Sequence, residues 1–228
     1  MKDIHGQAIL DFLKGDHSAP LIIHNNYDTP EEMDVEVFFR NELDFTVIEH
    51  LVLMESKGTV LDVGAGAGAI TLALQRKNLA VTALENSPGC VEVMQKLGVH
   101  RCLQKDLQKH QATYDTVLVL MNGLGLAGKL DDVPNFLNRC MAMLNEGGQL
   151  LIDSSDIDYL YDSLIEKPSG YYGEVRYRYE YKGQFGDWFD WVYVDPTTLK
   201  SITEKLNYHM ELLHQEETAQ YLARITFA

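Results

Sequence analysis

Two groups of residues in the first half of the chain suggest a binding site for a nucleotide-like ligand. Gly64, Gly66 and Gly68 alternate with alanines directly after the apolar stretch 59–63, and Glu85 ends a second apolar stretch. Glycines let the backbone approach a ligand closely, and the helix expected after them would offer free N–H groups. A carboxylate at the end of the next strand can accept two hydrogen bonds from a ribose diol. We therefore expect a ribose-bearing ligand here.

The glycine pattern alone does not identify that ligand. Residues 64–69 read Gly-Ala-Gly-Ala-Gly-Ala, which fits both G-x-G-x-G and the dinucleotide pattern G-x-G-x-x-G/A. Asp62 stands where a dinucleotide site usually has an apolar residue, and a long segment precedes the strand, whereas dinucleotide domains often open with it. An NAD(P)-dependent oxidoreductase on a Rossmann fold stays open as an alternative, because Ala69 completes the looser pattern.

Several segments together resemble class I S-adenosylmethionine-dependent methyltransferases. Residues 60–68, Val-Leu-Asp-Val-Gly-Ala-Gly-Ala-Gly, resemble the first motif of that family. Glu85 matches its acidic residue after the second strand, Asp106 matches the acid after the third, and 144–148 matches the glycine turn before the fifth. The resemblance covers about residues 36–228, and it implies S-adenosylmethionine as the cofactor.

A narrower resemblance concerns a subgroup of small bacterial methyltransferases of mostly unassigned substrate. It rests on residues 121–128, Met-Asn-Gly-Leu-Gly-Leu-Ala-Gly, on Phe-Phe-Arg at 38–40, and on Trp-Phe-Asp-Trp at 188–191. This combination of motifs is specific for the family, but the resemblance to the subgroup does not identify the methyl acceptor.

The family resemblance implies a role for each matching residue at the methionine end of the cofactor. Gly64, Ala65 and Gly66 would line the methionine part, and Asp62 would orient their loop and reach the amino group. Arg40 would pair with the carboxylate, since a planar guanidinium suits it. The equally weighted alternative for Arg40 is a surface cation on a helix.

Four further residues would hold the adenosine end according to the same resemblance. Glu85 would bind the ribose and Asn86 would flank the adenine. Asp106 would meet the exocyclic amine through its side chain, and Leu107 would do so through its backbone.

The resemblance puts Met121 and Asn122, at the end of the fourth expected strand, beside the transferable methyl. The implied reaction is in-line displacement of that methyl onto an oxygen or nitrogen of a small-molecule acceptor, for which alignment supplies much of the acceleration. No catalytic base is evident, and Asn122 and Asp153 are the candidates. A non-catalytic S-adenosylmethionine-binding module therefore remains a further alternative.

Aromatic residues concentrate between 159 and 193, where 12 of the 22 aromatic side chains lie. One interpretation is packing of an outer hairpin, since strands favour aromatics. The other is an aromatic wall over a small organic or cationic acceptor, with Tyr177, Tyr179, Trp188 and Trp191 as the candidates. Arg176 and Arg178 face away from the tyrosines in a regular strand, where they would bind an acidic acceptor or be solvated.

The elements that must position these residues follow from hydrophobic periodicity. Strands are expected at 59–63, 80–84, 101–103, 114–120 and 149–153, with helices at 69–77, 88–97 and 133–144 between them. This alternation indicates an α/β fold with a doubly wound, mostly parallel seven-stranded sheet. Residues 208–214 and 220–227 would form a C-terminal antiparallel hairpin after a helix at 196–206, and 175–194 a small antiparallel β insertion.

The N-terminal part reads as a separate cap. Residues 3–14 have the spacing of a short amphipathic helix, 21–23 are briefly extended, and 44–54 form another helix. Thr-Pro-Glu-Glu at 29–32 has the cap, proline and acids that typically begin a helix. We expect a helical and loop cap at 1–55 and a methyltransferase domain at 56–228, with the aromatic insertion at about 159–194.

Composition narrows the class of protein. The chain has 228 residues with 34 acidic and 19 basic side chains, and a net charge of -15 disfavours a broad nucleic-acid footprint. Three cysteines and scattered histidines give no metal-site spacing. No apolar run reaches the length of a membrane span and no secretory signal is evident, so we expect a cytoplasmic protein without metal or membrane partner. It would be a monomer or a homodimer.

Overall fold

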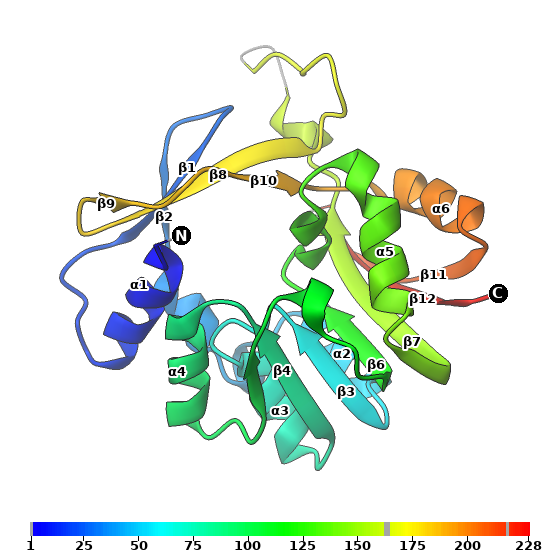
Figure 1. The fold of residues 1–228 in the computed structure, drawn as a ribbon. Helices are drawn as coiled ribbons and strands as arrows, with labels where there is room; N and C mark the ends of the chain where they lie inside the picture. The colour runs from blue at the N-terminus through cyan, green and yellow to red at the C-terminus, as the bar shows by residue number, and fades with distance from the viewer. Residues whose placement is uncertain (1, 162–164, 218) are drawn as a thin grey trace. The chain divides into compact units, whose positions relative to one another are not determined.

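The computed structural model describes residues 2–161, 165–217 and 219–228 (Figure 1). Its larger sheet contains β3 (Thr59–Val63), β4 (Ala80–Glu85), β5 (Cys102–Gln104), β6 (Tyr114–Val119), β7 (Leu144–Ser155), β11 (Tyr208–Gln215) and β12 (Gln220–Phe227). The strand order is β11-β12-β7-β6-β3-β4-β5. β3, β4 and β5 pair in parallel, as do β6 and β7, whereas β12 is antiparallel to both β7 and β11. The expected fold class is therefore confirmed.

Contacts divide the chain into two compact units, which we describe in turn. The first comprises Met1–Asn25, Thr29–His110 and Tyr177–Trp188, and the second comprises Asn26–Asp28, Gln111–Arg176 and Phe189–Ala228. The helices of the first unit are α1 (Ile4–Leu13), α2 (Val47–Glu55), α3 (Ala69–Arg76) and α4 (Pro88–Leu97), and those of the second are α5 (Val133–Met141) and α6 (Pro196–Lys205).

In the first unit, β3 and β4 form because their residues are almost continuously apolar and buried. Val60, Leu61 and Leu84 are at most 2% exposed, as expected for parallel strands covered on both faces. The register pairs Val63 with Leu84, so the two strands end together. α3 and α4 pack against β4, and α4 begins with Ser87 as its cap and Pro88 at the first helical position. This alignment brings the residues that follow β3 and β4 to one edge.

The expected helix start at 29–32 is wrong. Glu31–Met33 is a strand, β2, which pairs antiparallel with β1 (Leu21–Asn25), with Leu21 opposite Met33. The pairing satisfies the backbone groups that a helix would have bonded internally, and this tertiary context overrides the local preference. The turn of helix begins further on, as the 3₁₀ helix η1 (Val35–Phe39), capped by Asp34 through the backbone N–H of Glu36.

The β insertion is larger than expected because the N-terminal strands join it. β8 (Glu174–Tyr181) pairs antiparallel with β1, and β9 (Gln184–Phe185) folds back on β8. With β10 (Phe189–Val192), the order of this second sheet is β10-β8-β1-β2. Strands that are far apart in the sequence thus share one small sheet.

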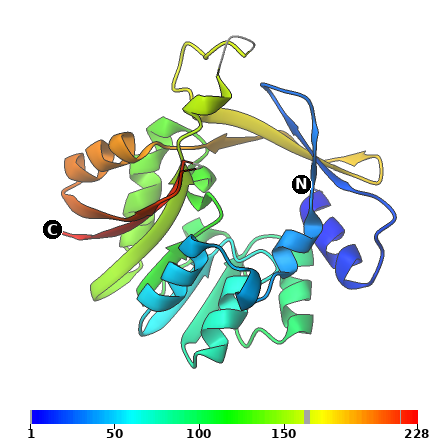
Figure 2. The same ribbon diagram turned by 180° about the vertical axis from the view of Figure 1, so that it is seen from behind.

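In the second unit, β7 is longer than the expected strand at 149–153 and starts at Leu144. Gly147 and Gly148 lie inside it, at an irregularity in its pairing with β6, instead of in a turn before it. β12 runs along β7 from Gln220 to Ile225, and the C-terminal hairpin of β11 and β12 is visible from behind in Figure 2. α5 packs against β7 and α6 against β11.

The described residues also contain the short 3₁₀ helices η2 (Glu42–Asp44), η3 (Leu107–Lys109), η4 (Gly123–Ala127), η5 (Leu130–Asp132) and η6 (Asp158–Leu160). Within the described residues, no helix has the length and apolar character needed to cross a membrane.

Candidate active site

The loop between β3 and α3 has the backbone shape that its glycines allow. Gly64, Gly66 and Gly68 all have positive φ, a backbone conformation that residues with a Cβ atom rarely adopt. A Cβ on Gly68 would come within 2.9 Å of Met94 Cγ, so this glycine is also needed for close packing on α4. A Cβ on Gly66 would meet only Phe38 Cδ1, at 3.8 Å. Apart from Phe38, the space beside the Gly66 Cα is therefore open.

Glu85 at the end of β4 binds that loop directly. Its Oε2 accepts a hydrogen bond from the Gly66 N–H at 3.0 Å, and its Oε1 accepts from Asn86 N at 2.8 Å and Ser87 N at 2.9 Å. Burial raises the pKa of Glu85, against the effect of the three N–H donors. A carboxylate offers about four acceptor positions, so a hydroxyl of a ligand can still bind. The structure thus brings the predicted acid and the predicted loop together.

Asp62 joins the two elements on either side of the loop. It is 4% exposed on β3, and its Oδ2 accepts a hydrogen bond of 2.6 Å from Thr71 Oγ1 on α3. Burial raises the pKa of Asp62 to about 6. The contact agrees with the expected orienting role, since it fixes β3 and α3 at the two ends of the glycine turn. Its contact with a cofactor amino group stays a prediction.

Asp106 and Leu107 begin η3, which follows β5. The Asp106 carboxylate accepts from Gln108 N at 2.7 Å and so caps η3. The preceding residue, Lys105, donates its N–H to the carbonyl of Glu85 at 2.9 Å. The start of η3 is therefore adjacent to the end of β4, as the adenine role requires, while the Asp106 side chain itself is exposed.

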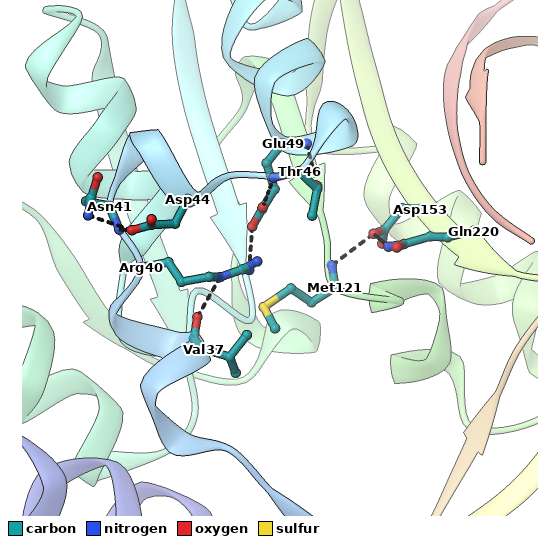
Figure 3. A network of polar contacts seen from close by, with 9 residues as sticks. All are labelled: Val37, Arg40, Asn41, Asp44, Thr46, Glu49, Met121, Asp153 and Gln220. Carbon is teal, nitrogen blue, oxygen red and sulfur yellow. Dashed lines mark hydrogen bonds and ion pairs between the residues drawn. The ribbon is translucent and has the colours of Figure 1, made fainter. Parts of the chain in front are cut away.

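Arg40 contacts residues outside the loop. Its Nη2 lies 2.7 Å from Glu49 Oε1, and its Nε donates to the carbonyl of Val37 at 2.9 Å (Figure 3). Glu49 also accepts from Thr46 N in the capping box that begins α2. Arg40 follows η1 and is partly buried against Glu49, so it is not the surface cation on a helix that was the alternative, and its pairing with a cofactor carboxylate stays a prediction.

In the second unit, Met121 and Asn122 follow β6 with left-handed backbones, φ 60° and 57°. Asp153 on β7 holds this turn, because its carboxylate accepts from Met121 N at 3.1 Å and Gln220 Nε2 at 2.9 Å (Figure 3). It also accepts from Gly123 N at 3.2 Å. Asn122 Oδ1 accepts from Ser155 Oγ at 2.7 Å.

Asp153 is 2% exposed, and burial raises its pKa to about 7. Both of its oxygens already bind N–H donors of the protein. These contacts favour a role for Asp153 in shaping the Met121–Asn122 turn. Its role as the catalytic base stays a prediction.

The four aromatic candidates are not gathered in one cluster. Tyr179 on β8 stacks on His5 of α1, with ring centroids 5.0 Å apart and an interplanar angle of 27°. Tyr177, two residues earlier, is buried on the same face of β8. Trp188 lies by Arg178, which is on the opposite face of β8. Trp191 belongs to the second unit, where it packs against Gly125 and Phe189.

Sequence reasoning missed that α1 docks on the start of α4 (Figure 1). Asp3, which caps α1 through Gly6 N, also accepts from Ser87 Oγ at 2.9 Å and from Gly89 N at 2.8 Å. The backbones approach so closely that a Cβ on Gly89 would be 2.4 Å from the Gly6 carbonyl carbon. Two glycines in otherwise helical segments, where glycine is unfavourable, were the available indication.

The docked helix also covers part of the glycine loop. Ala67 packs in a buried cluster with Ile9 and Leu10 of α1, and Phe38 of η1 joins the same cluster. His5 places its ring edge-to-face against Phe38, at 5.0 Å between centroids, and its Nδ1 lies 3.9 Å from Cys90 Sγ. Burial lowers the pKa of His5 to about 4. A neutral imidazole therefore contacts Phe38, the side chain that lies beside Gly66 in the loop.

Comparisons with known proteins agree with this geometry. A family model described as "Methyltransferase domain" matches residues 60–148, the segment that contains the loop and Glu85. A SAM-dependent methyltransferase from Bacteroides fragilis, solved with S-adenosyl-L-homocysteine, is 37% identical, with a TM-score of 0.93 over 100% of this chain and 95% of that chain. Comparison with the curated proteins found no significant match.

Two more distant structures share the fold. The CcbJ methyltransferase from Streptomyces caelestis is 12% identical with a TM-score of 0.62, covering 79% of this chain and 94% of that chain. DesVI from Streptomyces venezuelae is 15% identical with a TM-score of 0.57, covering 79% and 89%. The glycine loop bound by its strand-end acid, together with the full-length similarity to the Bacteroides fragilis enzyme, shows that this chain belongs to the S-adenosylmethionine-dependent methyltransferases.

Proposed function

We propose that this chain transfers the methyl group of S-adenosylmethionine to an oxygen or nitrogen atom of a small organic acceptor by in-line displacement. The observation that carries the proposal is the hydrogen bond from Gly66 N to Glu85 Oε2, which joins the glycine loop to the acid expected to bind ribose. The Bacteroides fragilis relative contains S-adenosyl-L-homocysteine, the product that such a transfer leaves behind. Family membership also decides between the two ligands that the glycine pattern left open.

The residues present fit this cofactor. The space beside the Gly66 Cα is open apart from Phe38, and Glu85 has acceptor capacity beyond its three N–H donors. Gly64 and Ala65 would contact the methionine part, and Asn86 follows Glu85 directly. Asp62 and Thr71 would keep the loop in place while the ligand binds.

The bound cofactor supplies a methyl group that its sulfonium already activates. The chain therefore has to align the acceptor, hold its own groups still and exclude water, and such alignment accounts for a large part of the rate in similar displacements. Asp62 and Glu85 are held by hydrogen bonds to Thr71, Gly66, Asn86 and Ser87, so they do not need to reorganise at the moment of reaction.

The proposed acceptor is small, with an aromatic wall beside it. Tyr179 and Phe38 lie on either side of His5 in the first unit, and Phe38 is the side chain nearest the open side of Gly66. An acceptor hydroxyl needs a base more than an amine does. Burial lowers the pKa of His5 to about 4, which makes its ring too weak a base for that step, so Asn122 and Asp153 stay the candidates.

Two measurements test the proposal. Calorimetry should detect binding of S-adenosylhomocysteine to the folded chain, and a metabolite extract supplied with isotopically labelled S-adenosylmethionine should yield a labelled small molecule. Absence of binding at millimolar ligand would contradict the cofactor assignment. Binding without any labelled product, across extracts that support label transfer by another methyltransferase, would favour the non-catalytic binding module.

A further inference from the structure

Arg178 is a cation in an unusual setting on β8. The tyrosines at 177, 179 and 181 point to one face of this strand, and Arg178 points to the other. On that face it lies opposite His24 of β1 in the antiparallel register. His24 Nε2 is 2.7 Å from Glu180 Oε2, so the nearest acid along the strand already has a partner.

The guanidinium of Arg178 contacts two aromatic rings and no acid. Its Cζ lies 4.4 Å from the centroid of Phe185 and 4.9 Å from that of Trp188. Within the described residues it makes no hydrogen bond and no ion pair, and its Nε is buried without a partner. The Arg178 side chain as a whole is partly exposed.

This arrangement leaves a polar group with unmet bonding capacity. A guanidinium carries five N–H donors in a fixed plane, and a buried donor without a partner is destabilising. The chain has 34 acidic side chains for 19 basic ones, so acids are not scarce. The neighbouring Arg176 shows the contrast, because its Nε is 3.1 Å from Asp190 Oδ1.

The two rings hold the guanidinium in position and are themselves partly exposed. Phe185 is 44% exposed and Trp188 is 38% exposed, which is unusual for large apolar side chains placed together. A flat apolar group can rest on these rings while an anionic group reaches the terminal nitrogens of Arg178. Stacking fixes the arginine in advance, so less conformational entropy is lost on binding.

We propose that Arg178, Phe185 and Trp188 form a second binding site, for a small molecule that carries an oxyanion on a planar apolar group. The oxyanion is a carboxylate or a phosphate, and the planar group stacks on the aromatic rings. This site is independent of the proposed methyl transfer, because it lies on the face of β8 opposite Tyr179, the residue that contacts His5.

Trp188 makes the site directly measurable. The chain contains two tryptophans, so Trp191→Phe leaves Trp188 as the only one. Its fluorescence would be followed during titration with benzoate, phenyl phosphate, acetate and inorganic phosphate, with sodium chloride holding the ionic strength constant. We expect a saturable change, tighter for benzoate and phenyl phosphate than for acetate and inorganic phosphate. The order within the first pair distinguishes the carboxylate from the phosphate.

Matched variants separate the site from general charge effects. Arg178→Gln should weaken binding by about 10- to 100-fold, the loss expected for a charged hydrogen-bond donor. Arg178→Lys keeps the charge without the planar fork and should be intermediate. Arg176→Gln, the same change two residues away, should bind as the parent does.

The Trp191→Phe variant could fail to fold, so the same titrations are repeated on the wild-type chain. There the indole N–H signals in NMR spectra report binding. Equal titration of the Arg178→Gln variant and its parent, or a response to benzoate no larger than that to sodium chloride, would overturn the proposal. S-adenosylhomocysteine binding, measured in parallel, reports on the proposed function alone, so the two can fail separately.

Discussion

Glu85 Oε2 accepts a hydrogen bond of 3.0 Å from the backbone N–H of Gly66, 19 residues earlier in the chain. The acid expected to bind ribose is therefore also part of the support for the glycine loop. Its other oxygen accepts from Asn86 and Ser87 at the start of α4. One carboxylate thus connects β4, the loop and α4, so changes at Glu85 should alter both the shape of the loop and ligand binding.

Replacing Glu85 by Ala should weaken S-adenosylhomocysteine binding by about 1 to 3 kcal/mol, the loss expected for a charged acceptor. Glu85→Gln should lose less, because its amide oxygen can still accept from Asn86 and Ser87. Calorimetry on folded variants measures both. Glu92→Gln, an exposed acid on α4 paired with Lys96, is the matched control and should bind like the wild type. Wild-type affinity in Glu85→Ala would contradict the ribose role.

The docking of α1 on α4 should depend on Gly89 having no side chain. In Gly89→Ala the new Cβ would lie 2.4 Å from backbone atoms of Gly6, which cannot move as a flexible side chain would. We expect a loss of about 1 to 3 kcal/mol in unfolding free energy, as for overpacking. Urea denaturation measures it. Gly170→Ala, which meets nothing within 4 Å, should leave the midpoint unchanged, and equal midpoints for both variants would refute the close contact.

His5 should make the folded protein sensitive to mild acid. Its folded-state pKa is about 4, below the ordinary value of 6.5, because burial disfavours the charged ring more than Asp3 favours it. Between these pH values the unfolded chain binds a proton that the folded chain does not, so stability falls as the pH decreases from 6.5 towards 4.

The variant His5→Gln removes this contribution. Between pH 7.5 and pH 5 the wild type should lose about 1 to 2 kcal/mol more unfolding free energy than the variant does, as the shift of His5 implies. Urea denaturation at both pH values gives the difference. Groups such as Asp62 titrate in both proteins and cancel in this comparison. Parallel pH profiles would show that His5 keeps its ordinary pKa when the chain is folded.

Arg40 and Glu49 should behave as a structural pair. Their side chains are 21% and 9% exposed, so Arg40→Met leaves the Glu49 charge poorly solvated. We expect a loss of about 1 to 3 kcal/mol in unfolding free energy, part of which Glu49→Gln should restore in the double variant. S-adenosylhomocysteine affinity in the double variant should stay within about threefold of wild type. A much larger loss of affinity in the folded double variant would instead support the predicted contact between Arg40 and the cofactor carboxylate.

The sequence by itself determined the elements whose patterns are local. β3, α4 and β12 have the boundaries that periodicity, capping residues and glycines predicted, and the glycine loop with Glu85 follows from two adjacent strand–helix units. These features depend on neighbouring residues, because a buried parallel strand, a cap and a left-handed turn each restrict residue types within a few positions.

Only the tertiary structure decided which distant segments meet. Glu31–Met33 became a strand because β1 supplied hydrogen-bond partners, and β1 itself pairs with β8, far along the chain. The docking of Asp3 on Ser87 and the ring partners of Tyr179 and Arg178 likewise needed the folded chain, whereas their opposite faces followed from strand alternation. A pairing between remote segments is stabilised by contacts that neither segment encodes alone, so no local pattern can predict it.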